Sequence, residues 1–196
     1  MFTRGDFNSY KSSQSLTNLN ESVRRTRYFS ALEKPYGKIS VFISHKHDDL
    51  DLEELKGVID MLEKEYNVVP YIDSMDNKMP EYTCTKTAER LKQVIEFCNK
   101  FILLATNNAI ESCWCNWEVG IGDVYKYKKN IAILPMQDKG KLYKGNEYLK
   151  LYSSIEYFDG TRLHRSGGII SKGFYVRTPS EEDYIITSLK EWLNNK

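Results

Sequence analysis

The sequence lacks the features that mark membrane, secreted and fibrous proteins. Its apolar runs are short, residues 101–105 being among the longest, and none approaches the roughly 18 residues of a membrane-spanning helix. Residues 1–20 are polar and hold no apolar stretch like that of a signal peptide. The 4 cysteines have no repeating spacing, which indicates reduced thiols rather than a disulfide framework. We therefore expect a cytoplasmic protein without a membrane segment.

An excess of charge of one sign is also lacking. The 28 Lys and Arg residues nearly balance the 27 Asp and Glu residues, which leaves a net charge of +1. Nucleic-acid-binding domains commonly carry a strong positive excess, so nucleic acid is not an expected partner. A chain of 196 residues is long enough for one domain with an appended segment. It buries about 70% of its unfolded surface, so it needs neither disulfides nor a structural metal.

Short apolar runs alternate with amphipathic segments through the middle of the chain. Four strands are predicted by β-branched and aromatic runs at residues 39–43, 68–72, 101–105 and 131–135. Three helices are predicted between them by apolar residues at helical spacing, over residues 52–62, 87–97 and 115–128. Pro70 favours an edge position for the second strand. Such alternation predicts βαβ units and a parallel sheet, and residues 148–157 are expected to add a short helix and a fifth strand.

The two ends of the chain depart from this pattern. We expect residues 1–37 to form a partly ordered N-terminal extension, because they are rich in Ser, Asn and Arg and lack an apolar run. The domain itself is expected to span residues 38–196, with a hairpin-like insertion near residues 160–177, where glycines gather. A C-terminal helix is expected to begin at an N-cap, Ser180, and to pack through Ile185 and Trp192.

One segment at the expected ligand-binding edge combines an indole with a carboxylate. Parallel sheets bind ligands beyond the carboxyl ends of their strands, which directs attention to residues 44–51, 73–85 and 106–114. Trp114 and Glu118 are four residues apart and share a helix face. An indole offers a stacking surface, and a carboxylate can stabilise positive charge on a sugar. The alternative is structural, with Trp114 packed in the core and Glu118 favouring the helix N-terminus.

Two sequence boxes resemble those of Toll/interleukin-1 receptor (TIR) domains. The first is Val41-Phe42-Ile43-Ser44-His45, an apolar strand that ends in Ser. The second is Ser112-Cys113-Trp114-Cys115-Asn116-Trp117-Glu118, which is similar to that family's Ser-x-Trp-Cys-x-x-Glu box. The resemblance covers residues 38–157 and implies a flavodoxin-like α/β fold, with a central five-stranded parallel sheet and helices on both faces. Standalone TIR proteins of this size resemble the signal-producing component of Thoeris antiphage defence.

The resemblance implies one of two functions. One is cleavage of NAD, with NAD as substrate rather than cofactor, to give nicotinamide and an ADP-ribose-derived nucleotide, expected to be cyclic. That nucleotide would diffuse to a downstream effector. The other function is scaffolding through TIR–TIR contacts without catalysis, and self-association is expected in either case. In enzymatic members the Glu of the second box is catalytic, and here it is Glu118.

The same resemblance implies where the other site residues lie. Ser44, His45 and Ser112 are expected to line the substrate pocket, Trp114 to shape it, and Asp73 to lie at its rim and anchor the long loop. The sequence departs from the family in that loop, which reads Lys78-Met79-Pro80-Glu81-Tyr82 where Pro-Gly is usual.

Several chemistries remain open on the sequence alone. Nicotinamide is a neutral leaving group, so one carboxylate suffices and no metal or cofactor is expected; water or an internal group can then capture the sugar. His45 and His47, with Asp48 and Asp49, could bind zinc, but no third or fourth ligand is spaced to complete a site. A further alternative is a deoxynucleoside-processing transferase, which would also use a carboxylate near a strand end and would ignore NAD.

Overall fold

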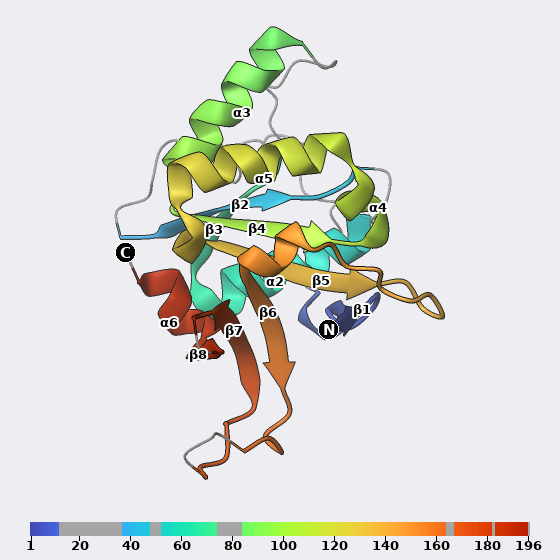
Figure 1. Cartoon of the computed structure of the whole chain (residues 1–196), viewed down its shortest axis with the longest axis vertical. Coiled ribbons are helices and arrows are strands. Elements are labelled where there is room, and N and C mark those ends of the chain that lie inside the picture. The colour runs from blue at the N-terminus through green and yellow to red at the C-terminus, as the bar shows by residue number, and fades with distance from the viewer. Residues whose placement is uncertain (12–36, 48–51, 74–83, 164–166, 182, 196) are drawn as a thin grey trace.

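The centre of the molecule is one mixed sheet flanked by helices (Figure 1). The structure is a computed structural model that describes residues 1–11, 37–47, 52–73, 84–163, 167–181 and 183–195. Its strands are β1 (Phe2–Thr3), β2 (Ile39–Ser44), β3 (Val68–Tyr71), β4 (Lys100–Ala105), β5 (Ile131–Gln137), β6 (Ser153–Phe158), β7 (Gly173–Pro179) and β8 (Tyr184–Ser188). In the described residues they run in the order β3-β2-β4-β5-β6-β7-β8, with β1 paired to β5.

Five neighbouring strands, from β3 to β6, are parallel, which confirms the predicted flavodoxin-like sheet. β3 lies at the edge, as Pro70 predicted, because proline cannot donate a backbone hydrogen bond to a further strand. β7 and β8 extend the opposite side in antiparallel pairing. The β6–β7 hairpin projects from the body of the sheet (Figure 1).

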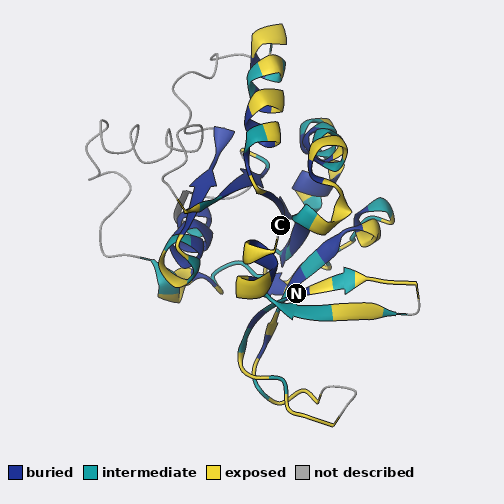
Figure 2. Ribbon diagram, turned by 90° about the vertical axis from the view of Figure 1, so that its left-hand side faces the viewer, coloured by how far each residue is buried: buried dark blue, intermediate teal, exposed yellow. Residues whose placement is uncertain are grey.

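Helices cover both faces of the sheet because its central strands are apolar on both sides. Along β2, Val41 and Ile43 belong to one core cluster and Phe42 to the other. The first cluster packs under α2 (Leu52–Tyr66) and α6 (Leu189–Asn194). The second packs under α3 (Thr85–Phe97), α4 (Asn107–Glu111) and α5 (Cys113–Lys126). Figure 2 shows the result as a band of buried strands between helices whose outer surfaces are exposed.

The alternation along β2 decides where its last residue points. Side chains of a strand alternate between the two faces, so Ser44 lies on the same face as Phe42. That face is the one covered by α5. The carboxyl end of β2 therefore presents a hydroxyl to the helix that carries the second sequence box.

The first eleven residues are packed into the domain. β1 pairs with the end of β5, in the register Phe2 to Met136, where β5 has passed its pairing with β6. Phe2 and Phe7 are buried in the first core cluster. A Cβ atom placed on Gly57 of α2 would lie 2.7 Å from the carbonyl oxygen of Phe7, so this close approach requires glycine. Residues 12–36 of the expected extension lie outside the described residues.

The prediction of where the C-terminal helix begins is wrong. The segment Tyr184–Ser188 is the strand β8, and α6 begins at Leu189 with Ser188 as its N-cap. The Ser180 Oγ instead closes a turn by accepting a hydrogen bond of 3.3 Å from the backbone N–H of Asp183. β-branched residues of β8 pair with β7, and this pairing outweighs the helical spacing of the apolar positions.

The region of the expected insertion contains a strand of the main sheet. Residues 160–172 connect two paired strands, and Gly173 begins β7, which pairs with β6. Residues 164–166 of this region lie outside the described residues. None of the helices in the described part of the chain is long and apolar enough to span a bilayer.

Candidate active site

A buried carboxylate and a buried hydroxyl meet where β2 ends beneath α5. The Ser44 Oγ donates a hydrogen bond of 2.5 Å to the Glu118 Oε2, across 74 residues of sequence. Ser44 is 1% exposed and Glu118 is 2% exposed. A short O–H···O⁻ distance is typical of a hydrogen bond to an ionised acceptor. The two sequence boxes therefore join in one buried polar pair.

The N-terminal part of α5 is fixed from several sides, and this fixes Glu118. Ser112 caps the helix by accepting a hydrogen bond of 3.4 Å from the backbone N–H of Cys115. The Asn116 side chain donates a hydrogen bond of 3.0 Å to the carbonyl of Ile110, which ties α5 to α4. It also accepts a hydrogen bond from the Tyr148 hydroxyl. Buried side chains on the inner helix face, such as Val119, hold the helix against the sheet.

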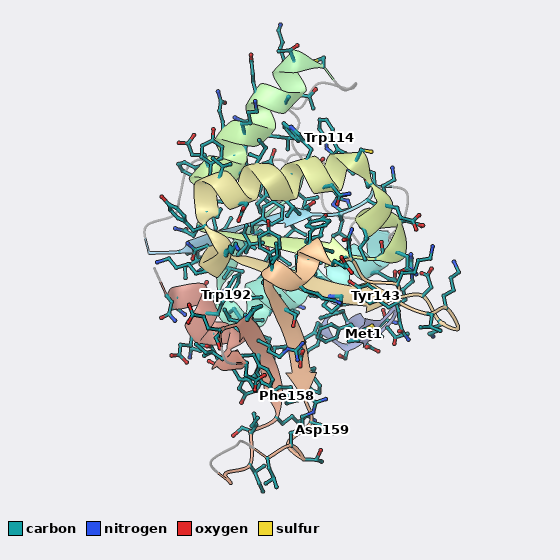
Figure 3. All side chains as sticks on the ribbon, viewed as in Figure 1. Met1, Trp114, Tyr143, Phe158, Asp159 and Trp192 are labelled. Atoms are coloured by element: carbon teal, nitrogen blue, oxygen red, sulfur yellow. The ribbon has the colours of Figure 1, made fainter. Side chains whose placement is uncertain are left out.

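Trp114 lies one helix turn before Glu118, at the end of α5 nearest α4 (Figure 3). Its indole forms a side-chain hydrogen bond to Glu118. Its ring stacks on Trp117 with centroids 5.1 Å apart. The pair of indoles is only partly buried, so an aromatic face borders the carboxylate. The structural alternative for Glu118, a residue that only favours the helix N-terminus, does not account for these two hydrogen bonds.

The surroundings of Glu118 raise its pKa well above the ordinary carboxyl range. Burial is the main cause, and the negative charge of Asp73 adds to it. The hydrogen bonds from Ser44 and Trp114 act in the opposite direction because they stabilise the ionised form. Such a carboxylate gains a great deal from a nearby cation, since the cation replaces the water that burial removed.

Asp73 follows β3, at the same carboxyl edge as Ser44. It is 8% exposed, and its Oδ2 lies 2.9 Å from the Nε2 of His47. Its charge acts on both Glu118 and His45. Its predicted position at the rim of a substrate pocket stays a prediction, and residues 74–83 of the following loop lie outside the described residues.

His45 is buried beside this group, and its ring stacks on that of His47 with centroids 5.1 Å apart. Burial lowers the pKa of His45, and the charge of Asp73 partly offsets this effect. Within the described residues its Nδ1 is buried without a hydrogen-bond partner. The neutral imidazole is therefore the favoured form.

A cavity of about 420 Å³ lies elsewhere on the molecule. Met1 and Tyr143, which lie close together in Figure 3, are among its lining residues, whereas Ser44 and Glu118 are not. Its carboxylates are Glu156, which is paired with Arg177 at 3.1 Å, and Asp183. The cavity therefore lies apart from the buried pair of Ser44 and Glu118.

The comparisons with known proteins agree with the geometry. No family model matches the chain. A protein of Bacillus cereus (strain MSX-D12), named "Probable 3' cyclic ADP-D-ribose synthase ThsB'", is 27% identical over 201 residues. The alignment covers 98% of this chain and 94% of that protein. This near full-length similarity, together with the two boxes and the sheet order, supports a TIR-like protein.

Ser112 lies at the N-terminus of α5. The Ser112 hydroxyl caps α5 and contacts the Cys115 thiol. Its place at the pocket wall remains a prediction. The role of His47 as a neighbour of Asp73 was missed, because the two residues are 26 positions apart and only the parallel pairing of β2 and β3 brings them together.

Proposed function

We propose that this TIR-like protein cleaves the N-glycosidic bond of NAD and releases nicotinamide and a cyclic ADP-ribose. The observation that carries the proposal is the buried Glu118, held between the Ser44 hydroxyl and the Trp114 indole. A carboxylate in this environment favours a substrate that is cationic or becomes so. NAD meets this requirement, because its nicotinamide is a pyridinium and its ribose develops positive charge during cleavage.

The chemistry balances without a cofactor. The bond between the ribose C1′ and the pyridinium nitrogen breaks, and its electron pair neutralises the nicotinamide, which leaves without a proton. Glu118 stabilises the oxocarbenium-like ribose, as carboxylates do in glycoside hydrolysis. A nucleophile within the same molecule then bonds to C1′ and loses its proton, which closes the ring. Water at that position would give ADP-ribose instead.

The other site residues have proposed roles around this step. Trp114 shapes the pocket and offers its indole face to a planar ring. Ser44 holds Glu118 in position, and His45 and Ser112 line the pocket. Asp73 lies at the rim and keeps the site negative, which favours a cationic substrate.

The name of the Bacillus relative supports a cyclic product here, and the similarity spans nearly the whole of both chains. In this proposal the nucleotide diffuses to a downstream effector in Thoeris antiphage defence. The proposed compartment is the cytoplasm, where NAD is abundant and where the free cysteines Cys84, Cys98, Cys113 and Cys115 would stay reduced.

The test is to incubate concentrated protein with NAD and to separate the products by chromatography with mass detection. Nicotinamide should appear as NAD is consumed, and the second product should be one water lighter than ADP-ribose. A product with the mass of ADP-ribose would show that water captures the ribose, so that the reaction is hydrolysis rather than cyclisation. Absence of turnover in the presence of a lysate from phage-infected cells would contradict the enzyme and favour a TIR scaffold. Deoxynucleosides, supplied in a parallel reaction, should remain intact.

The pH dependence of the reaction is expected to follow the ionisation of the Glu118 carboxyl group. Since catalysis needs the ionised carboxylate, kcat/KM should fall with decreasing pH through the raised pKa of Glu118, with a midpoint above the ordinary carboxyl range. Asp73→Asn removes a negative charge that raises this pKa, so the midpoint should move to lower pH. Initial rates of nicotinamide release, measured across a pH series, give both midpoints.

Asp159→Asn provides the matched control, because Asp159 lies at the end of β6 on the projecting hairpin (Figure 3). Its profile should coincide with that of the wild type. A midpoint that stays unchanged in Asp73→Asn would contradict the electrostatic coupling of Asp73 to Glu118.

Self-association through TIR–TIR contacts is a further part of the proposal. A site framed by loops gains order when a neighbouring copy packs against it, and ordering of this kind couples assembly to activity. We expect turnover per protein molecule to rise with protein concentration at saturating NAD. Rates measured over a dilution series check this, and a turnover independent of concentration would contradict it.

A further inference from the structure

Three side chains with nitrogen and oxygen donors gather at the carboxyl ends of β2 and β3. They are His45, His47 and Asp73, and one potential ligand atom from each lies within 4.8 Å of the others. Two of them are already in contact, because the His47 Nε2 and the Asp73 Oδ2 are 2.9 Å apart. The sequence supplied only the two histidines of this group. The third donor comes from the parallel pairing of the two strands.

We infer that His45, His47 and Asp73 form a binding site for a zinc ion, and that zinc bound there inhibits the enzyme. Two imidazoles and one carboxylate are a donor set that zinc accepts, with a fourth position left for water. Magnesium, in contrast, prefers oxygen donors throughout. The donor set therefore selects a borderline-soft divalent cation.

The geometry of the cluster is close to that of a bound site. Ligand atoms around tetrahedral zinc are about 3.4 Å apart, given bonds of roughly 2.0–2.1 Å. Separations of up to 4.8 Å need only a modest inward shift. The His47 side chain is 49% exposed, so it has room to rotate. Asp73 and His45, both buried, form the fixed part of the site.

The buried edge of His45 is an independent sign of a ligand. Its Nδ1 is shielded from solvent and, among the described residues, lacks a hydrogen-bond partner. Buried polar atoms are nearly always satisfied by a partner, a water or an ion. A histidine whose pKa is lowered by burial is also neutral, and only the neutral ring binds a metal.

Inhibition follows from the position of the cluster, and this part of the inference rests on the proposed cleavage of NAD. His45 and Asp73 belong to the proposed substrate pocket, so a metal that holds them restricts entry of NAD. The charge of Asp73 also acts on Glu118. A dication on Asp73 would neutralise that charge and repel the positive charge that develops on the ribose.

Binding is tested first, without any activity measurement. Chelator-treated full-length protein is titrated with zinc against a chromogenic chelator, in the wild type and in His47→Ala. We expect one zinc ion per wild-type chain and at least a tenfold weaker affinity in the variant. Two controls, His164→Ala at the remaining histidine and Cys113→Ser at an exposed cysteine, should bind as the wild type does. Equal affinity in His47→Ala and wild type would overturn the site.

Inhibition is then expressed, for each protein, as the ratio of its rate of nicotinamide release with zinc to its rate with chelator. Nicotinamide release is measured with chelator and with zinc, and magnesium at the same concentration serves as the comparison. Zinc should lower the wild-type rate at least tenfold, with much less effect on His47→Ala, and magnesium should leave both unchanged. A wild-type rate that zinc leaves unchanged or raises would overturn the inhibition. If the chelator-treated wild type releases no nicotinamide, the proposed function fails, and the binding titration still decides the zinc site.

Discussion

Glu118→Gln is expected to reduce nicotinamide release from NAD by about 1,000-fold or more, which corresponds to about 4 kcal/mol of transition-state stabilisation. The amide has nearly the shape of the carboxylate, and its oxygen can still accept the hydrogen bond of Ser44. The change therefore removes the negative charge and leaves the geometry in place. Single-turnover rates of nicotinamide formation, measured at high protein concentration, give the size of the loss.

The same substitution is expected to make the protein more stable. Because the pKa of Glu118 is raised in the folded state, the folded protein pays for an ionised buried carboxylate above that pKa. The cost is absent below the ordinary carboxyl pKa, where the group is protonated in both states. Glu118→Gln should therefore raise the melting temperature by a few degrees at about pH 8, and the difference should shrink towards about pH 4.

Glu111→Gln is the matched control for both measurements. Glu111 lies on the neighbouring helix α4, and its exposed side chain is paired with Lys144 at 2.9 Å. It should change neither the rate nor the melting temperature appreciably, because exposed ion pairs contribute little to stability. A Glu118→Gln variant that retains wild-type turnover would exclude Glu118 as the catalytic residue.

Phe7→Ala is expected to lower the free energy of unfolding by about 3–4 kcal/mol. Phe7 is 3% exposed, and its ring lies 5.1 Å from that of Phe2 and 6.0 Å from that of Phe174. A Cβ atom placed on Gly57 would lie 2.9 Å from the Phe7 Cβ, so α2 also packs closely against this residue. A drop of this size corresponds to a fall in melting temperature of about 10 °C.

Ser9→Ala tests whether this effect belongs to the buried ring. Ser9 lies two residues away in the same N-terminal segment, and its side chain is exposed. Chemical unfolding of both variants should show a large loss for Phe7→Ala and a change within about 0.5 kcal/mol for Ser9→Ala. Equal stabilities of Phe7→Ala and the wild type would show that the first eleven residues do not contribute to the core.

The parallel part of the sheet could be predicted from the sequence because its strands are buried on both faces. Runs such as Phe101–Ala105 have no polar residue to suggest another structure, and helices separate them at regular intervals. The last strand, Tyr184–Ser188, was missed for the opposite reason. Ser180 and the acidic residues after it resemble a helix start, and only pairing with β7 makes the following segment a strand.

The candidate site also contains residues that could be predicted from the sequence and residues that could not. Glu118 and Trp114 could be recognised because they lie within one short stretch, on one helix face. The contact of Ser44 with Glu118 depends on strand alternation and on which face α5 covers, so only the edge of the sheet could be predicted for it. The cluster of His45, His47 and Asp73 requires the register of two strands. Metal-ligand spacing along the chain cannot reveal such a group.

The pairing of β1 with β5 has a consequence for biosynthesis. Arg4 bonds to Asp138, 134 residues further along, so this segment must wait for those later residues to be synthesised before it finds its partners. Until then Phe2 and Phe7 remain exposed, and closing so long a loop is slow. The N-terminal segment would therefore dock last, after the parallel strands have formed. Ribosome-bound chains that end before residue 137 should leave it accessible to protease.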